Sequence, residues 1–362
     1  MVDPARIATG RRVAIDWHLV GRPKHDETDV GRYQQGLTAA LAAHAQPADD
    51  VWALVAWPGA VDALGPGIGH AGVGHREVGR NAREVRQMLA TLRPDLAVFA
   101  HVAPSGLPVP FALVMHDALF ATHREWLGRD ERGRTLARAA GRARIVVAVS
   151  EVARIDVLSV LDLSPERVVV IPPAPAPVFA PDPAAGARIA ARYGISRYGV
   201  AIGDTDARGN LAHLADAVGQ LGDRGLTVVS PQRPPRGRHD LPGIRFLGPL
   251  GDAERADLLA AAQFAAALSF YDACGLGALE ALACGTPLVV SDRGALREVV
   301  GGAALVIPPS VNAIAEGLRA VQEPGVADRL RFAGPTRAAA YSPARLGDAA
   351  WVAVRGALES AR

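Results

Sequence analysis

Short apolar runs alternate along this chain with longer segments whose apolar residues recur at helical spacing. Runs of four to six residues are typical of strands buried on both faces of a parallel sheet. Helical periodicity is found between them, for example over residues 31–44 and 80–92. The first half of the chain is therefore predicted to be an α/β domain with a parallel sheet. Its strands are expected at residues 13–17, 51–56, 96–100, 111–115, 145–149 and 168–171.

A proline-rich segment separates the two halves of the chain. Residues 172–186 read PPAPAPVFAPDPAAG, and proline at this density excludes regular structure and stiffens the connection. The strand and helix pattern resumes at Tyr198, and the tail from Pro343 has the pattern of an amphipathic helix. We predict two Rossmann-like domains with a ligand cleft between them, at the carboxyl ends of the strands. The predicted boundaries are 1–172, 173–342 and a final helix over 343–362.

Composition and charge narrow the class of protein. A chain of 362 residues accommodates two domains of roughly 150 residues each. A net charge of +2 predicts no nucleic-acid partner and no strong membrane field, although it leaves peripheral membrane contact open. Two cysteines argue against a disulfide framework and favour a reducing compartment. Because no apolar run reaches roughly 18 residues and the N-terminus lacks a signal core, we expect a cytoplasmic protein.

The most informative segment is residues 268–308, LSFYDACGLGALEALACGTPLVVSDRGALREVVGGAALVIP. A strand is predicted at 264–269, and the Ala/Leu-rich run 276–284 predicts a helix that ends at Gly285. The loop around Gly275 therefore joins the carboxyl end of a strand to the N-terminus of a helix. Exposed amides and the helix dipole favour an anionic group there, such as a diphosphate.

Two carboxylates flank this turn, with seven residues between them. Asp272 lies on the loop, where it would face the hydroxyls of a sugar. Glu280 lies about one turn into the helix, where its carboxylate would accept two hydrogen bonds from the cis-diol of a ribose. The spacing alone fits an ordinary strand, turn and helix with two solvated acids equally well.

The segment resembles the donor-site signature of retaining, family-4-type glycosyltransferases of the GT-B fold. In that family two glutamates with seven residues between them are followed by Ala, Cys-Gly-Thr-Pro, a strand and Glu-Val-Val-Gly. The same order occurs here at Asp272, Glu280, Ala281, 284–287 and 298–301. Shorter matches in family order are RFLG at 245–248, YGVAIGDTDARGN at 198–210, Gly31-Arg32-Tyr33, His116-Asp117 and Val149-Ser150-Glu151.

The resemblance implies an α/β, GT-B fold with an acceptor-binding N-terminal domain, a donor-binding C-terminal domain and a final helix that crosses back to the first domain. It implies transfer of a sugar from a nucleoside-diphosphate sugar to a hydroxyl of a saccharide, lipid-linked or small-molecule acceptor, with retention and without a required metal or other cofactor. The implied catalytic residues are His116, Arg208 and Asp272. The donor-binding residues are Gly203, Asn210, Gly275, Leu276, Gly277 and Glu280, and the acceptor-side residues are Gly31, Arg32 and Asp117.

Some positions depart from the family pattern. The family's Arg-Lys-Asn is Arg-Gly-Asn at 208–210, so the lysine that would help to neutralise the leaving diphosphate is absent. The first acid is Asp272 where the family has Glu. These departures keep open a catalytically silent GT-B protein that binds a nucleotide, a glycan or a partner. An isomerase or pseudo-glycosyl coupling enzyme is a third reading.

Another cation could take the place of the missing lysine. The candidates in the sequence are Arg233, Arg236, Arg238 and Arg293.

Two further motifs are interpreted as coincidental. The sequence GIGHAG at 67–72 spells the dinucleotide fingerprint but neither follows an apolar strand nor opens a helix. Asp204-Thr205-Asp206 spells the Asp-x-Asp motif of metal-dependent glycosyltransferases of another fold, and we expect it to bind no metal. Acceptor contacts are expected in loops around 18–33 and 66–80.

Overall fold

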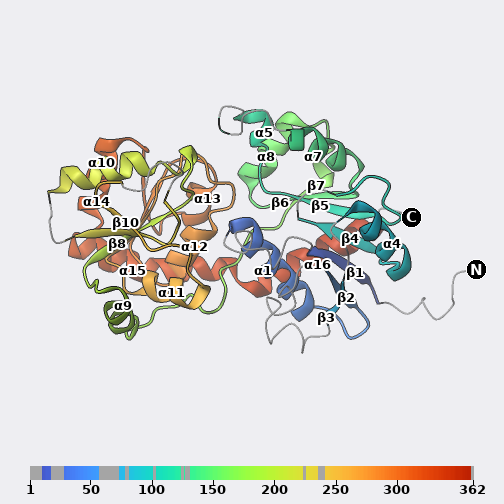
Figure 1. Ribbon diagram of the computed structural model, residues 1–362, viewed down its shortest axis with the longest axis horizontal. Coiled ribbons are helices and arrows are strands. Elements are labelled where there is room, and N and C mark those ends of the chain that lie inside the picture. Colours follow the sequence, from blue (N-terminus) through green and yellow to red (C-terminus); the bar gives the residue numbers. More distant parts are fainter. Residues whose placement is uncertain are drawn as a thin grey trace, which may run out of the picture. The chain divides into compact units, whose positions relative to one another are not determined.

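The computed structural model describes residues 10–17, 28–56, 73–77, 81–100, 103–123, 126, 131–222, 226–234 and 241–359. The chain divides into two compact units (Figure 1). Unit 1 consists of Met1–Pro173 together with Pro343–Arg362, and unit 2 consists of Ala174–Ser342. Both units are α/β structures built on parallel sheets, which confirms the predicted fold class.

Unit 1 contains a seven-stranded sheet in the order β3-β2-β1-β4-β5-β6-β7. Every pairing in it is parallel. The apolar runs that predicted these strands form the core of the unit, since all the residues of β4, β5 and β6 are buried. The strands are β1 (Arg12–Trp17), β2 (Asp50–Val55), β3 (Val73–Glu77), β4 (Leu96–Phe99), β5 (Phe111–Met115), β6 (Ile145–Ala148) and β7 (Val168–Val170).

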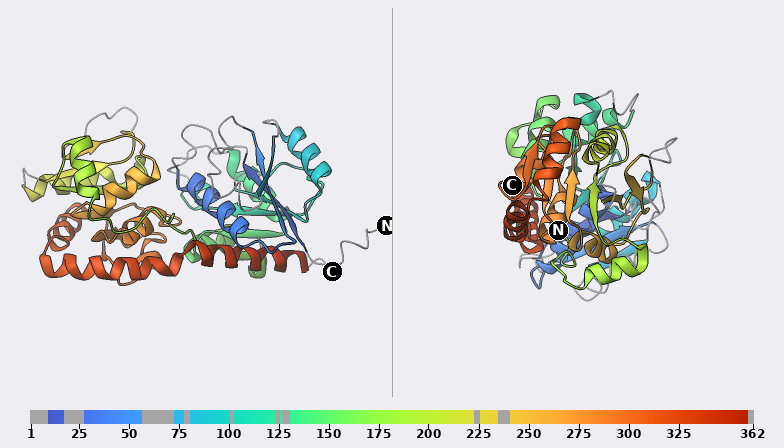
Figure 2. Two further views of the ribbon diagram at one scale, coloured as in Figure 1. Left: turned by 90° about the horizontal axis from the view of Figure 1, so that it is seen from below. Right: turned by 90° about the vertical axis from the view of Figure 1, so that its left-hand side faces the viewer.

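The helices of unit 1 include the last one of the chain. Those in the described residues are α1 (Asp29–Ala43), α4 (Ala82–Leu92), α5 (Leu119–Thr122), α7 (Glu131–Arg142), α8 (Glu151–Val160) and α16 (Pro343–Glu359). The indole of Trp351 on α16 donates a hydrogen bond of 2.8 Å to the carbonyl of Leu41 on α1. Arg355 pairs with the buried carboxylate of Asp49 at 2.8 Å. Figure 2 shows α16, in dark red, running along unit 1. The predicted return of the last helix to the first domain is therefore confirmed.

Unit 2 contains a six-stranded parallel sheet in the order β10-β9-β8-β11-β12-β13. Its strands are β8 (Tyr198–Ile202), β9 (Thr227–Ser230), β10 (Ile244–Phe246), β11 (Phe264–Ala267), β12 (Leu288–Ser291) and β13 (Leu305–Ile307). The helices are α9 (Ala185–Tyr193), α10 (Leu211–Leu221), α11 (Asp252–Ala260), α12 (Leu276–Ala283), α13 (Leu296–Val300), α14 (Val311–Ala320) and α15 (Pro324–Ala338). Helices α10 and α14 cover one face of the sheet, and α9, α11, α12 and α15 cover the other (Figure 1).

One prediction in unit 1 is wrong. Residues 66–80 were expected to form an acceptor loop, but Val73–Glu77 form strand β3, which pairs in parallel with β2. The sequence VGHRE has no apolar run, so its side-chain pattern did not predict a strand. At the edge of a sheet, backbone hydrogen bonds to one neighbouring strand are enough to hold such a segment. The segment 67–72 and most of the expected acceptor loop at 18–33 lie outside the described residues.

Some helix boundaries differ by one or two residues from the predictions, and α1 covers Asp29–Ala43 where 31–44 was expected. Helix α4 begins at Ala82 because the side chain of Asn81 caps it, accepting the amides of Arg83 and Glu84 at 3.0 Å. Helix α9 begins at Ala185, just inside the proline-rich segment that was expected to be irregular. Among the helices in the described ranges, none has both the length and the apolarity that a membrane crossing requires.

Candidate functional site

In unit 2 the loops that follow three neighbouring strands meet at one edge of the sheet. Strands β8, β11 and β12 are adjacent and parallel, so their carboxyl ends lie side by side. The amide of Phe270 donates to the carbonyl of Arg208 at 2.7 Å, which joins the loops after β8 and β11. The amide of Ala295 donates to the carbonyl of Asp272 at 2.7 Å, which joins the loops after β11 and β12. The predicted donor-side residues are thereby gathered at one edge.

The carboxylate of Asp272 shapes the turn that leads into α12. Its Oδ1 accepts the amide of Cys274 at 3.0 Å and that of Gly275 at 2.6 Å. Gly275 is the N-cap of α12 in the left-handed conformation, with φ 65°. Because its amide is already bound to Asp272, an anion at this helix end would meet the following amides, those of Leu276 and Gly277. The N-cap residue itself is a glycine and has no side chain to cap these amides.

Two glycines let the loops and α12 approach one another closely. A Cβ on Gly277 would lie 2.5 Å from Cγ2 of Ile202, so only glycine allows α12 to pack on β8 at this point. Gly203, at the end of β8, has a φ of 122°, and a Cβ there would lie 2.9 Å from the hydroxyl of Ser269. The first turn of α12 is therefore held against the end of β8.

Glu280 occupies a buried position on α12 and is paired with an arginine that is missing from the predicted site. Its side chain is 4% exposed, and Oε1 accepts a hydrogen bond of 2.7 Å from Nη2 of Arg255 on α11. The same Nη2 lies 3.2 Å from Oδ1 of Asp252, and the guanidinium stacks over Phe179 with its Cζ 5.2 Å from the ring centroid. The pairing satisfies the charge of a carboxylate that burial would otherwise make costly. The ribose-binding role of Glu280 stays a prediction.

A signal for Arg255 does exist in the sequence. It lies three and four residues before Leu258 and Leu259, on the face of α11 that those leucines bury. A charged residue on an apolar helix face calls for a buried partner of opposite charge, because burying an unpaired charge is strongly unfavourable. The helical periodicity therefore predicts that Arg255 has a buried acidic partner, but it does not predict that this partner is Glu280.

The loop after β8 places Arg208 between two carboxylates. Its Nε donates to Asp206 Oδ2 and its Nη2 to Asp204 Oδ2, both at 2.9 Å. The two aspartates of the Asp-x-Asp motif are thus engaged with an arginine. Over the ranges of the chain that the structure describes, no cluster of three His, Cys, Asp or Glu side chains could hold a metal ion.

Asn210 fixes this loop to its neighbours. Its backbone is in the left-handed conformation with φ 57°, and the residue is 4% exposed. The side-chain amide donates to the carbonyls of Leu268 and Pro309, each at 3.0 Å. Both amide hydrogens are therefore used on the loops after β11 and β13. Asn210 holds the edge in shape, and its predicted contact with the donor stays a prediction.

In unit 1 the predicted His116 directly follows β5, at the carboxyl edge of that sheet. Its ring meets the ring of Tyr33 edge to face, with centroids 5.3 Å apart and an interplanar angle of 87°. The Tyr33 hydroxyl donates to the carbonyl of Ile171 at 2.8 Å. Tyr33 thus joins α1 to the ends of β5 and β7. This tyrosine belongs to the Gly31-Arg32-Tyr33 motif, but nothing in its sequence context predicted the contact.

The predicted acceptor-side residues lie at the starts of helices. Asp117 accepts the amide of Leu119, the first residue of α5, at 3.0 Å. The amide of Gly31 donates to the hydroxyl that caps α1, at 3.1 Å. Arg32 pairs with Asp29 at 2.5 Å within the same turn. The structure gives each of these residues a local contact, and their acceptor contacts stay predictions.

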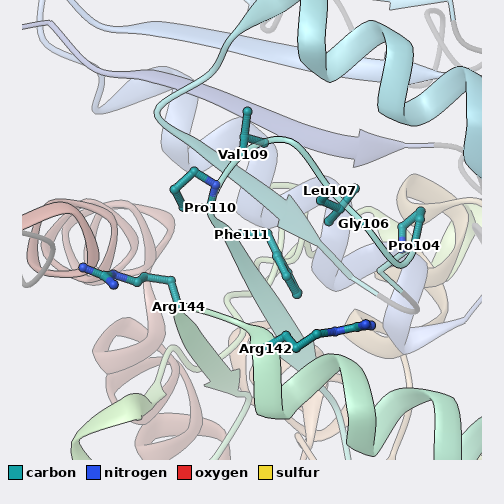
Figure 3. A pocket seen from close by; sticks show the side chains of 8 residues that line it. All are labelled: Pro104, Gly106, Leu107, Val109, Pro110, Phe111, Arg142 and Arg144. Atoms are coloured by element: carbon teal, nitrogen blue, oxygen red, sulfur yellow. The ribbon is translucent and has the colours of Figure 1, made fainter.

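A separate hollow of about 340 Å³ lies at the opposite, amino-terminal edge of the sheet in unit 1 (Figure 3). Figure 3 shows the side chains of Arg142 and Arg144 pointing in opposite directions, and Nε of Arg144 donates to the carbonyl of Ala357 on α16 at 2.9 Å. None of the predicted site residues lines this hollow, so we do not assign it to the candidate site. Its lining residues are Pro104, Gly106, Leu107, Val109, Pro110, Phe111, Arg142 and Arg144.

Comparison with known families agrees with this geometry in both halves of the chain. Residues 55–174 match the family described as Glycosyltransferase Family 4. Residues 197–323, which contain the edge described above, match the family described as Glycosyl transferases group 1. The chain belongs to the family-4-type glycosyltransferases of the GT-B fold.

Two curated members of the family are named as mannosyltransferases. O-antigen chain mannosyltransferase B of Escherichia coli is 30% identical over 215 residues, covering 54% of this chain and 56% of that protein. The MMP alpha-(1->4)-mannosyltransferase of Mycolicibacterium hassiacum is 33% identical over 233 residues, covering 59% of this chain and 54% of that protein. The chain thus spans about half the length of these relatives in the alignments.

Solved structures share the fold over almost the whole chain. Sucrose-phosphate synthase from Thermosynechococcus elongatus superposes with a TM-score of 0.77 at 18% identity, covering 97% of this chain and 100% of that chain. Anabaena Alr3699/HepE, solved in complex with UDP-glucose, superposes with a TM-score of 0.75 at 15% identity, covering 96% and 100%. At these identities the likeness shows the GT-B fold of the family.

Proposed function

We propose that this protein is a retaining glycosyltransferase that moves a sugar from a nucleoside-diphosphate sugar to an acceptor hydroxyl. The observation that carries the proposal is the edge of unit 2, where the loops after β8, β11 and β12 converge on the first turn of α12. The backbone amides and the dipole of that turn suit a diphosphate. Family membership supports the reaction class, and the UDP-glucose complex of a protein with the same fold supports the class of donor.

Three of the site residues have a defined role in this proposal. Asp272 accepts hydrogen bonds from hydroxyls of the transferred sugar with the carboxylate oxygen that does not cap the turn. Glu280 binds the ribose diol while it remains paired with Arg255, since one carboxylate offers about four acceptor positions. In unit 1, His116 hydrogen-bonds a hydroxyl of the sugar.

The family resemblance also suggests how the bond is exchanged. The acceptor hydroxyl attacks the anomeric carbon from the face that the diphosphate leaves. The proton of that hydroxyl passes to the departing phosphate oxygen as the glycosidic bond to phosphate breaks. No enzymatic nucleophile and no metal ion takes part in this scheme. Catalysis then rests on positioning and on stabilising the negative charge of the leaving group.

Nucleotide binding provides the first test. Thermal unfolding is measured with UDP, GDP, ADP, dTDP and CDP, and a nucleotide at 100-fold above its Kd should stabilise the protein by about 2.7 kcal/mol. We expect one base to dominate. A chain that none of the five stabilises would contradict the proposal.

Hydrolysis of the donor provides the second test. Nucleoside-diphosphate mannoses are tried first, because two curated relatives are named as mannosyltransferases. Release of free sugar and nucleoside diphosphate is followed without an acceptor. The Asp272→Asn variant keeps an oxygen that can cap the turn but loses the negative charge, so it should retain its nucleotide affinity and release sugar more slowly. Equal rates for the variant and the wild type would remove Asp272 from the sugar site.

A second function is favoured by one observation. The cation of Arg208 is already balanced by two aspartates, and the neighbouring lysine of the family is missing. A catalytically silent protein that binds a nucleotide or a glycan would fit this arrangement. It would be stabilised by a nucleotide yet hydrolyse no donor, whereas the proposed enzyme shows both properties.

A further inference from the structure

The loop after β8 has no room for the missing lysine. A Cβ placed on Gly209 would lie 1.6 Å from the carbonyl oxygen of Asp204 and 2.7 Å from its carbonyl carbon. Atoms do not approach so closely, and the obstacle is backbone, so it does not yield to a side-chain rotation. The family lysine is therefore excluded by the path of this loop. Its charge has to come from another element if the site binds a diphosphate.

The remaining arginine of this loop is poorly suited to supply that charge. Arg208 donates to Asp204 and to Asp206 through different nitrogens, at 2.9 Å each. One guanidinium and two carboxylates together carry a net negative charge. A diphosphate approaching this loop would compete with both carboxylates for Arg208 and would be repelled by them.

Arg293 lies in the loop between β12 and α13. The strand β11, which leads into α12, separates β12 from β8 and the loop of Arg208. Its side chain is 57% exposed, and within the described part of the chain its Nε contacts only Asp292, at 3.1 Å. A pair of exposed neighbouring residues is weak, since such pairs typically contribute at most about 1 kcal/mol. The guanidinium of Arg293 is therefore available to a stronger anion in a way that Arg208 is not.

The backbone next to Arg293 is in direct contact with the turn that begins α12. Gly294 has a φ of 56°, and a Cβ on it would lie 2.2 Å from the carbonyl oxygen of Asp272. The amide of Ala295 donates to that same oxygen at 2.7 Å. Asp272 in turn accepts the amide of Gly275, the N-cap of α12. Two consecutive hydrogen bonds therefore connect the loop of Arg293 to the helix end that is proposed to bind the diphosphate.

The other arginines considered from the sequence are placed less favourably. Arg233 follows β9, which is separated from β11 by β8, whereas β12 pairs directly with β11. The end of β9 is hydrogen-bonded instead toward the far side of the sheet, where the amide of Leu247 donates to Ser230 at 2.9 Å. Arg236 and Arg238 lie outside the described residues.

We propose that Arg293 binds the diphosphate of the donor and stabilises its charge as the sugar departs, in place of the lysine that Gly209 excludes. The inference rests on the proposed function. A guanidinium suits this task because it offers parallel N–H donors to two phosphate oxygens and keeps its charge at any physiological pH. Negative charge grows on the diphosphate as the bond to the sugar breaks, so the contact strengthens in the transition state.

The test compares a nucleoside diphosphate with the nucleoside of the same base. Arg293→Gln should weaken binding of the diphosphate about tenfold to a hundredfold, the range expected for a lost hydrogen bond to a charged group. Its affinity for the nucleoside should stay within about twofold of the wild type. It should also lower kcat for sugar transfer or donor hydrolysis. Arg293→Lys should recover part of both losses, because it restores the charge without the planar fork.

Arg233→Gln is the matched control, because it removes the same charge from a more distant loop of the same edge. It should leave the discrimination between diphosphate and nucleoside unchanged. The inference is overturned if Arg293→Gln has no effect, if it weakens both ligands equally, or if Arg233→Gln produces the loss instead. A wild-type chain that binds no nucleoside diphosphate would overturn the proposed function and this inference together. Normal wild-type binding with an unaffected Arg293→Gln variant would overturn this inference alone.

Discussion

Replacement of Arg255 by methionine should destabilise unit 2 by about 3 to 5 kcal/mol, the usual cost of leaving one partner of a buried ion pair behind. This value for a buried pair applies here, because the side chains of Arg255 and Glu280 are only 9% and 4% exposed and their charged atoms lie 2.7 Å apart. For a domain the size of Ala174–Ser342, each kcal/mol lowers the unfolding midpoint by roughly 2 to 4 °C. The midpoint should therefore fall by roughly 6 to 20 °C.

The assay uses the distribution of tryptophans. All five lie outside residues 174–342, so their fluorescence follows unit 1, while far-UV circular dichroism follows both units. A loss seen by dichroism and absent from fluorescence would place the damage in unit 2. The double variant Arg255→Met with Glu280→Leu should recover to within about 1 to 2 kcal/mol of the wild type, since apolar replacements of buried pairs are often neutral.

The control is Arg188→Met on α9, which removes an arginine that pairs with Asp257 and Asp182 at the surface. Its side chain is 47% exposed, so the loss should be at most about 1 kcal/mol. The unpaired-charge explanation is refuted if Arg255→Met costs no more than this control. It is also refuted if the double variant is less stable than Arg255→Met alone, because the cost would then come from lost packing and not from an unpaired carboxylate.

Two further predictions concern other positions in unit 2. Gly209→Lys should lower stability and leave affinity for nucleoside diphosphates no better than in the wild type, because a Cβ there would meet a carbonyl at 1.6 Å. Gly219→Lys is the control in thermal unfolding. A Cβ at Gly219 on α10 would have no atom within 4 Å, so this variant should not be destabilised. Tighter binding of nucleoside diphosphates by Gly209→Lys would contradict the steric exclusion of the lysine. Burial, aided by the charge of Glu280, raises the pKa of the Cys284 thiol to about 12. This thiol should therefore resist a thiol reagent at pH 8 until the protein unfolds, and its contribution to stability should be complete below about pH 9 and decline as the pH rises toward 12. Rapid labelling of Cys284 in the native protein, read by mass spectrometry, would contradict it.

Much of the fold was predictable because its strands are buried on both faces. Runs such as Phe111–Met115 are wholly apolar, and their bounds in the structure agree with those expected. Helix α12 was bounded correctly because Gly285 and Pro287 end it. Strand β3 was missed because backbone pairing at a sheet edge leaves little trace in the side-chain pattern.

The candidate site was predictable in position more than in detail. The order of strands and glycine turns along the chain is enough to place Asp272 and Gly275 at a carboxyl edge. The partner of Glu280 was not predictable, since Arg255 is 25 residues away and the two meet only through the packing of α11 on α12. The pairing of Arg208 is different in kind. Its two aspartates lie two and four residues earlier, so the local sequence already contained that contact.

The docking of α16 on α1 also has a consequence for the order in which the protein is made. Unit 2 is a single continuous stretch, Ala174–Ser342, so all of it is synthesised before Pro343–Arg362. Unit 1 needs Pro343–Arg362 to cover the surface where Trp351 binds Leu41. Although domains generally fold in the order of synthesis, the unit that leaves the ribosome first is here the one that finishes last. Until then the surface of α1 that Trp351 will cover stays exposed in the nascent protein.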